Sequence, residues 1–301
     1  MLKQLAIIVV IITSLLSAHT ASAEEVTIST FRGEKTVTAN PQTTVVLDLH
    51  ALDTLQALGV KVDATLDNVY LDYLTGAAQG VERVGSLFQP DFEAIHALAP
   101  DLVIAGGRSY ESVPDLEKIA PTIDMTIWGD TVAQGLQRLD ALAEIYDKKS
   151  RAEQLRADFD SKMEKARLLA ANQGRTLIVM TNGPKISAYG ASGRFGWLHK
   201  NVGLVEAVND VERTTHGEAI SFEFIRDANP DTLLVIDRAS AIGRGAVSAK
   251  STLDNAMVRE INAWKNGRVI YLSAGPIYIA NGGIQSMNQT LDELLAGFAS
   301  Q

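Results

Sequence analysis

The chain has 301 residues and an acidic balance, with 27 lysines and arginines against 36 aspartates and glutamates, which gives a formal charge of −9. Because a nucleic-acid partner requires a basic surface, this charge argues against nucleic-acid binding. The sequence contains no cysteine, which excludes disulfides, thiolate metal sites and a cysteine nucleophile.

Residues 1–23 have the pattern of a cleavable signal peptide. Lys3 precedes an apolar run over residues 5–16, and the small residues Ala21-Ser22-Ala23 stand before Glu24. The run is too short to span a bilayer and no later stretch reaches the required length, so we expect a soluble mature chain. A lipid anchor would need a cysteine at the cleavage point, so we expect none. Since an exported protein without an anchor is retained only behind an outer membrane, we predict a periplasmic location.

Strand and helix patterns alternate along the first half of the mature chain. Residues 26–38 alternate around Arg32-Gly33, which predicts a β-hairpin. A continuous apolar strand is expected at 44–49, followed by a helix that ends at Gly59. Further elements are expected in the order helix 92–98, strand 102–105, helix near Leu116, strand around Ile123 and helix 132–146. This alternation is typical of parallel β/α layers.

Residues 148–172 form a charged segment whose apolar residues recur at steps of three and four. One stripe of a single helix would carry all of them: Ala152, Leu155, Phe159, Met163, Ala166 and Ala170. Asp147 can cap the first turn, and Gly174 stands where a left-handed exit would fall. About 25 residues at roughly 1.5 Å each give a rod of roughly 37 Å. On pattern alone this is either a surface helix of one domain or a helix that joins two.

The alternation begins again after this helix. Strands are expected at residues 176–180, 232–236 and 268–272, and the last helix carries Ile284, Met287, Leu291, Leu294 and Phe298 on one face. The second half therefore repeats the β/α pattern of the first.

A short phrase is shared by the two halves. Phe92-Glu93-Ala94-Ile95 leads to Pro100-Asp101, and 130 residues later Phe222-Glu223-Phe224-Ile225 leads to Pro230-Asp231. Because the internal spacing is identical, we favour a repeated lobe architecture. The expected fold is α/β, with two Rossmann-like lobes, residues 24–146 and 174–301, joined by a single long helix at 147–173. A ligand cleft is expected between the lobes.

Three arginines stand in loops that follow predicted strands, namely Arg108, Arg194 and Arg238. Since the strand ends of both lobes converge on the cleft, all three can face it. A guanidinium is always charged, weakly hydrated and planar, so three of them in an acidic protein predict capture of an anionic, oxygen-rich ligand. The alternative for each is a local ion pair, such as Arg238 with Asp237 or Arg108 with Glu111.

Two further side chains in these loops, an imidazole and a phenol, are candidates for ligand binding. His216 lies in a polar loop, and Tyr278 follows the last predicted strand, where simple packing is its alternative role. Iron(III) can take a phenolate and an imidazole while arginines balance the anionic oxygens of a chelator. His50 directly follows a strand and can either line the cleft mouth or cap a helix. His96 and His199 fall in or beside predicted helices, which indicates structural or surface roles.

An enzyme would need a nucleophile tied to a base. Ser187 or Ser192 with His216 is the pairing that the loops offer, with nothing to favour it. The sequence has neither the Gly-x-Ser-x-Gly elbow nor the glycine spacing of a phosphate-binding loop.

Over its whole mature length the chain resembles the periplasmic binding proteins of ABC-type iron importers, in the branch that binds ferric siderophores of the catecholate type. The stretches that carry the resemblance are residues 46–48 with 51–55, 185–190 through 194–196, Thr215-His216-Gly217, and Ile277-Tyr278 followed by Gly282-Gly283. The resemblance implies a helical backbone between the lobes and a cleft lined by Arg108, Arg194 and Arg238. It also implies that His216 and Tyr278 bind iron when a tetradentate siderophore leaves two positions open.

The resemblance further implies that Glu93 and Glu223 dock on arginines of an inner-membrane permease, one glutamate per lobe. A carboxylate at a solvated helix N-terminus is favourable in any case, and the two roles are compatible. The chain departs from the family at His50, where a small or aromatic residue is usual, and at Ala280-Asn281 ahead of the paired glycines.

We therefore expect a monomeric binding protein, not an enzyme, with no permanent cofactor, that delivers iron(III) as a ferric siderophore to an ABC importer. Haem, a corrinoid or a hydroxamate siderophore are alternative ligands, and quenching of Trp197 or Trp264 fluorescence would separate them. A metal-dependent hydrolase would show turnover. A binder of free zinc or manganese would need three or more clustered His and acid ligands.

Overall fold

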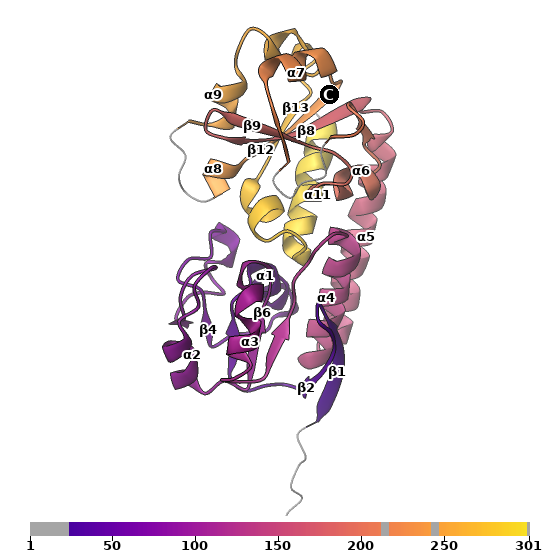
Figure 1. The fold of residues 1–301 in the computed structure, drawn as a ribbon. Helices are drawn as coiled ribbons and strands as arrows, with labels where there is room; N and C mark the ends of the chain where they lie inside the picture. Colours follow the sequence, from indigo (N-terminus) through magenta and orange to yellow (C-terminus); the bar gives the residue numbers. More distant parts are fainter. Residues whose placement is uncertain (1–23, 212–216, 242–246, 300–301) are drawn as a thin grey trace, which may run out of the picture.

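The computed structural model describes residues 24–211, 217–241 and 247–299. Its chain forms a two-stranded hairpin and two larger sheets, one in each half of the molecule, with a long helix running beside both larger sheets (Figure 1). The expected signal peptide, residues 1–23, and the expected iron ligand His216 lie outside the described residues.

The first lobe is built on a five-stranded sheet in the order β5-β4-β3-β6-β7, and every pairing in it is parallel. A separate antiparallel hairpin of β1 (Glu25–Thr30) and β2 (Gly33–Thr38) precedes it, as predicted. The remaining elements are β3 (Thr44–Val46), α1 (Leu49–Leu58), β4 (Ala64–Thr65), η1 (Asp72–Leu74), β5 (Glu82–Arg83), α2 (Phe92–Leu98), β6 (Leu102–Ala105), η2 (Gly107–Ser112), α3 (Val113–Leu116), β7 (Thr122–Asp124) and α4 (Thr131–Ile145).

The second lobe has the strand order β11-β9-β8-β12-β13, with β10 also beside β8. Its elements are β8 (Arg175–Asn182), β9 (Lys185–Tyr189), α6 (Trp197–Lys200), β10 (Val205–Glu206), β11 (Glu218–Ile220), α7 (Phe222–Ala228), β12 (Thr232–Asp237), α8 (Arg238–Ala241), α9 (Ala249–Leu253), η3 (Val258–Glu260), α10 (Asn262–Lys265), β13 (Val269–Leu272), η4 (Gly275–Ile279) and α11 (Ile284–Ala299). The pairings β8–β9 and β9–β11 are antiparallel. The expected parallel alternation therefore stops at this hairpin, where Gly183, with φ +60°, permits a tight turn between the strands.

The long helix α5 spans Lys149–Ala170, and its buried residues are the six of the predicted stripe. Its start differs from the expectation, because Lys148 occupies the cap position without a side-chain cap and Asp147 has a left-handed φ of +51°. An aspartate in that conformation lies outside the helix and does not cap it. Gly174, with φ +66°, leads the chain into β8 as expected.

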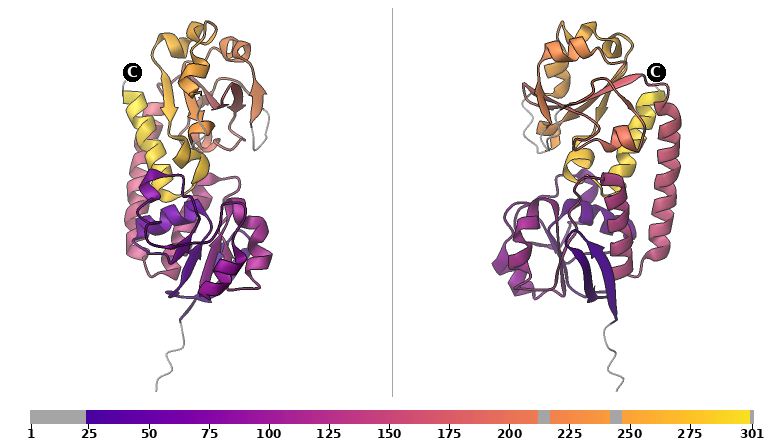
Figure 2. Two further views of the ribbon diagram at one scale, coloured as in Figure 1. Left: turned by 90° about the vertical axis from the view of Figure 1, so that its left-hand side faces the viewer. Right: turned by 45° about the vertical axis from the view of Figure 1, so that its right-hand side comes forward.

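The C-terminal helix α11 packs along α5 and also contacts α1 of the first lobe (Figure 2). Its predicted apolar face, from Ile284 to Phe298, is buried. Asp53 of α1 accepts hydrogen bonds from the backbone N–H groups of Gln285 (2.8 Å) and Ser286 (3.0 Å) in the first turn of α11. A side chain of the first lobe thus caps a helix that follows the last strand of the second, which ties the lobes together beyond α5.

The repeated phrase folds into the same unit twice. In α2, Asp91 accepts the N–H of Ala94, and in α7 Ser221 accepts that of Phe224; each helix has seven residues and ends in a left-handed residue. The strand that follows each helix, β6 or β12, lies beside the first strand of its sheet's β/α series, β3 or β8. The two lobes therefore share a local architecture, as the spacing predicts.

Buried apolar side chains form one large cluster and one smaller one. The large cluster joins the first lobe, α5, α11 and one face of the second sheet, while the smaller cluster covers the other face of that sheet. Within the described ranges, no helix is both long enough and apolar enough to cross a membrane.

Candidate functional site

Tyr278 is the centre of the candidate site. It lies in η4, a single π-helical turn closed by the bond from Ala280 N–H to the Gly275 carbonyl (3.2 Å). The three predicted arginines surround its ring, with guanidinium carbons 4.5 Å (Arg194), 5.5 Å (Arg108) and 5.7 Å (Arg238) from the ring centroid. Two of these arginines come from the second lobe and one from the first. The structure thus brings four of the five predicted ligand-binding residues together.

The guanidiniums hold this turn by hydrogen bonds. Arg238 Nε donates to the Tyr278 hydroxyl at 2.9 Å, and Arg194 donates to the Tyr278 carbonyl at 2.8 Å. Arg108 makes longer bonds of 3.3 and 3.4 Å to the carbonyls of Ile279 and Tyr278. Each interaction is with a neutral acceptor, so the positive charges are oriented but not neutralised.

The alternative of local ion pairs is not seen for these arginines. Among the described residues, no carboxylate forms an ion pair with any of the three. Asp237 instead accepts the backbone N–H groups of Ala239 and Ala249, and Glu111 accepts the Tyr110 hydroxyl. The cluster therefore presents net positive charge in a protein that is acidic as a whole.

Burial and the charges within this cluster shift the pKa values of its members. Burial lowers the pKa of Arg194, and the positive charge of Arg108 lowers it further. Burial raises the pKa of the Tyr278 phenol, but the hydrogen bond from Arg238 and the charges of the three arginines outweigh burial, so this pKa lies below its ordinary value. Arg194 Nε is buried and finds no hydrogen-bond acceptor in the part of the chain that the structure describes. An anionic oxygen bound here would reduce the repulsion between the guanidiniums. It would also accept a hydrogen bond from Arg194 Nε.

A cavity of about 330 Å³ lies beside the cluster, between the two lobes. Arg108 and Arg194 both line it, the first from the first lobe and the second from the glycine-rich loop of the second lobe. The other lining residues are Asp48, Leu49, His50, Leu87, Gly107, Ile127, Trp128, Gly129, Thr131, Ser192, Gly193, Ile279 and Asn281. Polar and apolar side chains both line this cavity, and convergent polar groups of this kind are typical of a small-molecule site.

Trp128 is a lining residue that the sequence patterns did not single out. Its side chain is 61% exposed, and its backbone N–H donates to Gln134 Oε1 at 2.6 Å. It lies just after β7, and loops after strands are where Arg108 and Arg238 were found, so the same rule could have indicated it. The tryptophans proposed as fluorescence reporters are placed less well, because Trp197 is buried and Trp264 packs on the smaller core cluster.

The histidines have different environments. His50 does not present a free nitrogen to the cleft, because its ring is buried and both nitrogens have hydrogen-bond partners. His96 is exposed on α2, and His199 is buried with Nδ1 2.9 Å from the Leu204 carbonyl, in agreement with the structural and surface roles predicted. His216, and with it the suggested Ser187 or Ser192 pairing, cannot be placed because it is outside the described residues. Within those residues no three His, Asp or Glu side chains gather as a metal site.

Glu93 and Glu223 occupy matching positions in the two lobes. Each is exposed in the first turn of its short helix, α2 or α7. The hydrogen bond from Ser221 lowers the pKa of Glu223, which keeps it ionised. The two carboxylates are therefore free to meet a basic partner.

The protein-family model described as "periplasmic binding protein" matches residues 44–275 of this chain. The chain belongs to the periplasmic binding protein family. Relatives of this family member include the petrobactin-binding protein YclQ of Bacillus subtilis, 35% identical over 266 residues that cover 87% of this chain and 84% of YclQ. The ferric-anguibactin-binding protein FatB of Vibrio anguillarum is 30% identical over 276 residues, 89% of this chain and 86% of FatB.

Solved structures of the family have the same fold. The crystal structure of YclQ superposes with a TM-score of 0.85 and 34% identity, covering 92% of this chain and 100% of that one. The periplasmic catecholate-siderophore binding protein VctP of Vibrio cholerae gives a TM-score of 0.81 and 33% identity, with 91% and 100% covered. The family resemblance and the two-lobe fold predicted from the sequence are confirmed.

Proposed function

We propose that this periplasmic binding protein captures a ferric siderophore, with catecholates as its ligand class, and delivers it to an ABC-type importer of the inner membrane. The observation that carries the proposal is the set of three guanidiniums without carboxylate partners around Tyr278, beside a cavity between the lobes. A ferric catecholate is a bulky anion whose negative charge lies on its oxygens, and this arrangement complements it.

Arg108, Arg194 and Arg238 neutralise the chelate and donate hydrogen bonds to its catecholate oxygens. Arg194 contributes the buried Nε that has no acceptor among the described residues. The iron(III) arrives as part of the cargo, so the protein needs no permanent cofactor.

With a tetradentate siderophore, Tyr278 and His216 bind the iron directly. The lowered pKa of Tyr278 favours the phenolate that a hard trivalent cation prefers. The Tyr278 hydroxyl accepts a hydrogen bond from Arg238, so ligation exchanges part of this contact for a bond to iron. Arg238 then lies free to hold a chelate oxygen.

The relatives support this ligand class. YclQ is named for petrobactin, VctP for catecholate siderophores, and a further structural neighbour, BauB, was solved with two molecules of acinetobactin and ferric iron at a TM-score of 0.83 and 29% identity. The family consists of binding proteins, and we assign no catalytic residue to this chain.

Delivery involves the two exposed glutamates. We assign Glu93 and Glu223 to docking on basic residues of the permease, since they stand in the same unit of each lobe. The lobes comprise residues 24–146 and 174–301, with 147–173 as the helix between them, and the mature, unlipidated protein acts as a periplasmic monomer.

A spectroscopic titration with a ferric bis-catecholate tests the proposal. Binding is expected at one chelate per protein, without turnover, with a change in the ligand-to-metal charge-transfer band as Tyr278 ligates iron. Arg194→Met should weaken binding, while His216→Ala with Tyr278→Phe should remove the spectral change. No saturable binding by the unmodified protein would refute the function, and an unchanged spectrum in the double variant would refute direct ligation.

A further inference from the structure

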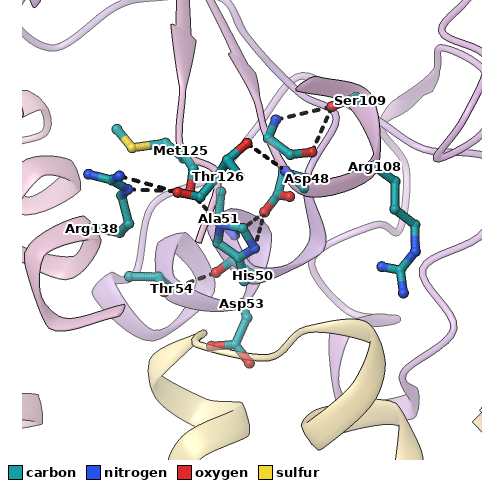
Figure 3. A network of polar contacts seen from close by, with 12 residues as sticks. Asp48, His50, Ala51, Asp53, Thr54, Arg108, Ser109, Met125, Thr126 and Arg138 are labelled. Carbon is teal, nitrogen blue, oxygen red and sulfur yellow. Dashed lines mark hydrogen bonds and ion pairs between the residues drawn. The ribbon is translucent and has the colours of Figure 1, made fainter. Parts of the chain in front are cut away.

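Beside the loop of Arg108, His50 and Asp48 form a buried pair (Figure 3). His50 Nδ1 lies 2.8 Å from Asp48 Oδ1, and Nε2 lies 2.7 Å from the Met125 carbonyl oxygen. Asp48 Oδ1 also accepts the N–H of Ala51 at 2.9 Å, as the cap of α1, so this oxygen acts as a hydrogen-bond acceptor. Because a carbonyl and a carboxylate only accept hydrogen bonds, both ring nitrogens of His50 must donate. The geometry is that of an imidazolium.

The same carboxylate supports the loop that carries Arg108. A Cβ atom added to Gly107 would lie 2.8 Å from Asp48 Oδ2, and one added to Gly106 would lie 3.3 Å from it, so the loop backbone packs directly on Asp48. On its other side, the N–H of Gly107 donates to Thr126 Oγ1 at 3.0 Å. The residue before Arg108 is therefore fixed between two polar side chains.

His50 connects these two supports, because one of its nitrogens contacts Asp48 and the other contacts Met125, the neighbour of Thr126. Removal of the imidazolium would leave the Asp48 carboxylate without its counter-charge and the Met125 carbonyl with one partner fewer. Asp48 and His50 both line the cavity between the lobes. An uncompensated carboxylate there would face an anionic ligand.

Charged groups surround His50 on several elements. Arg138 of α4, which is 2% exposed, donates to the same Met125 carbonyl at 3.3 Å, and Asp124 of β7 is the acid that faces Arg138. Burial lowers the pKa of His50, but the charge and hydrogen bond of Asp48 and the bond to Met125 outweigh burial and the charge of Arg138, so this pKa lies above its ordinary value. The surroundings thus keep the ring protonated to a higher pH than an unperturbed imidazole.

We propose that His50, as an imidazolium between Asp48 and Met125, is a positioning residue that holds the loop of Arg108 in place for the anionic ligand. It acts through Asp48 and does not touch the iron. The inference rests on the proposed function for the identity of the ligand, but the protonation of His50 can be tested without any ligand.

The first test is ¹⁵N NMR of the ligand-free protein with labelled histidine, using His50→Gln for assignment and exposed His96 as the internal reference. Both ring nitrogens of His50 should be protonated at about pH 6.5, and the second proton should leave at a pH above this value, at which an unperturbed imidazole loses its proton. A neutral tautomer that predominates at about pH 6.5 would overturn the proposal.

The second test measures affinity for the ferric complex of a hexadentate tris-catecholate, which needs no iron ligand from the protein. His50→Gln should weaken binding by about 10-fold to 100-fold, the range expected when a contact residue is displaced. Asp48→Asn with His50→Gln should recover most of this loss, because it removes the uncompensated carboxylate while asparagine keeps the cap. His96→Gln is the matched control and should bind as the unmodified protein does.

Circular dichroism of each variant establishes that it is folded. Equal affinity of His50→Gln and the unmodified protein would overturn the proposal, as would a double variant no better than the single one. If the unmodified protein bound no ferric chelate, the proposed function would fail, and the NMR measurement would still decide the state of His50.

Discussion

The loops that carry Arg108 and Arg194 face the same cavity from opposite lobes, yet they are supported in different ways. The Arg108 loop rests on buried polar groups, chiefly Asp48 and its partner His50. The Arg194 loop rests mainly on apolar packing, since the next residue, Phe195, is fully buried with its ring 4.6 Å from that of Tyr189. A carboxylate meets this loop further from Arg194, where the N–H of Ala191 donates to Glu206 Oε1 at 2.6 Å. Backbone turns close this second loop.

The comparison distinguishes two ways of holding an arginine in position, by charged groups and by packing. A support made of charged groups changes when one of them loses its proton, whereas a support made of packed rings and close backbone contacts depends on shape alone. We therefore expect the Arg108 side of the site to respond to pH and the Arg194 side to respond to changes in volume.

The largest effect is expected from Gly196→Ala, which tests the shape-based support. A Cβ atom at Gly196 would lie 2.0 Å from the Ala191 carbonyl oxygen and 3.0 Å from that of Gly193. The loop must then open, with a loss of about 2–4 kcal/mol in the free energy of unfolding and of more than about 100-fold in affinity. Urea unfolding measures the change in stability, and titration with the ferric chelate measures the change in affinity. Gly76→Ala, where the added atom meets nothing within 4 Å, is the control, and equal stability of the two variants would contradict the prediction.

A milder change to the same loop is Phe195→Leu. It removes the ring contact with Tyr189 and should lower the free energy of unfolding by about 1 kcal/mol. The accompanying loss of affinity should be the same at about pH 6.5 and about pH 8.5, because the contact that is removed joins two rings that stay neutral over this range, with burial raising the pKa of Tyr189 to about 12. A loss that grew with pH would show that the contrast between the two loops is wrong.

His50 should link stability to pH. Since its pKa in the folded protein lies above the unfolded value of about 6.5, its contribution is fully present below that pH and is lost as the pH rises through the folded value. The difference in free energy of unfolding between the unmodified protein and His50→Gln should therefore be larger at about pH 6 than at about pH 9. Urea unfolding at both values measures it, and a difference independent of pH would contradict the account.

The smallest effect is expected from Trp128→Ala. Stacking of an aromatic ligand ring on this exposed indole contributes about 0.5–1.5 kcal/mol, or about 2-fold to 10-fold in affinity. Titration of a ferric catecholate should show that loss, together with the loss of ligand-dependent fluorescence quenching. Trp264→Phe, on the far face of the second sheet, should retain the quenching. Quenching that is undiminished in Trp128→Ala would show that the ligand does not lie against Trp128.

Much of the fold could be predicted because its signals are local. The apolar run of β6, the glycine at the end of α1 and the stripe of α5 all lie at their predicted positions, since periodicity and turn residues act over a few residues. The same holds for Arg108 and Arg238, because the parallel strands β6 and β12 deliver their following loops to one edge of each sheet. Arg194 follows the antiparallel strand β9, so this rule does not account for its position.

The features that the sequence patterns did not indicate depend on contacts between segments that are far apart in the chain. The bonds from α11 to Asp53 join residues more than 200 positions apart, and no local pattern specifies them. His50 was expected at the cleft mouth or as a cap; it does line the cavity between the lobes, but the cap is Asp48, and no sequence pattern indicated that His50 is its buried partner. Trp128 is exposed and belongs to no periodic apolar pattern, so periodicity could not indicate it. Such features follow from how the lobes and loops pack.

A crystal structure of the protein with a ferric bis-catecholate tests the central claim most directly. The account predicts that the chelate lies between the lobes, with its oxygens within hydrogen-bonding distance of Arg108, Arg194 and Arg238 and with its iron bonded to the Tyr278 oxygen. A chelate bound outside this cavity, or inside it without contact to the three guanidiniums, would contradict the account.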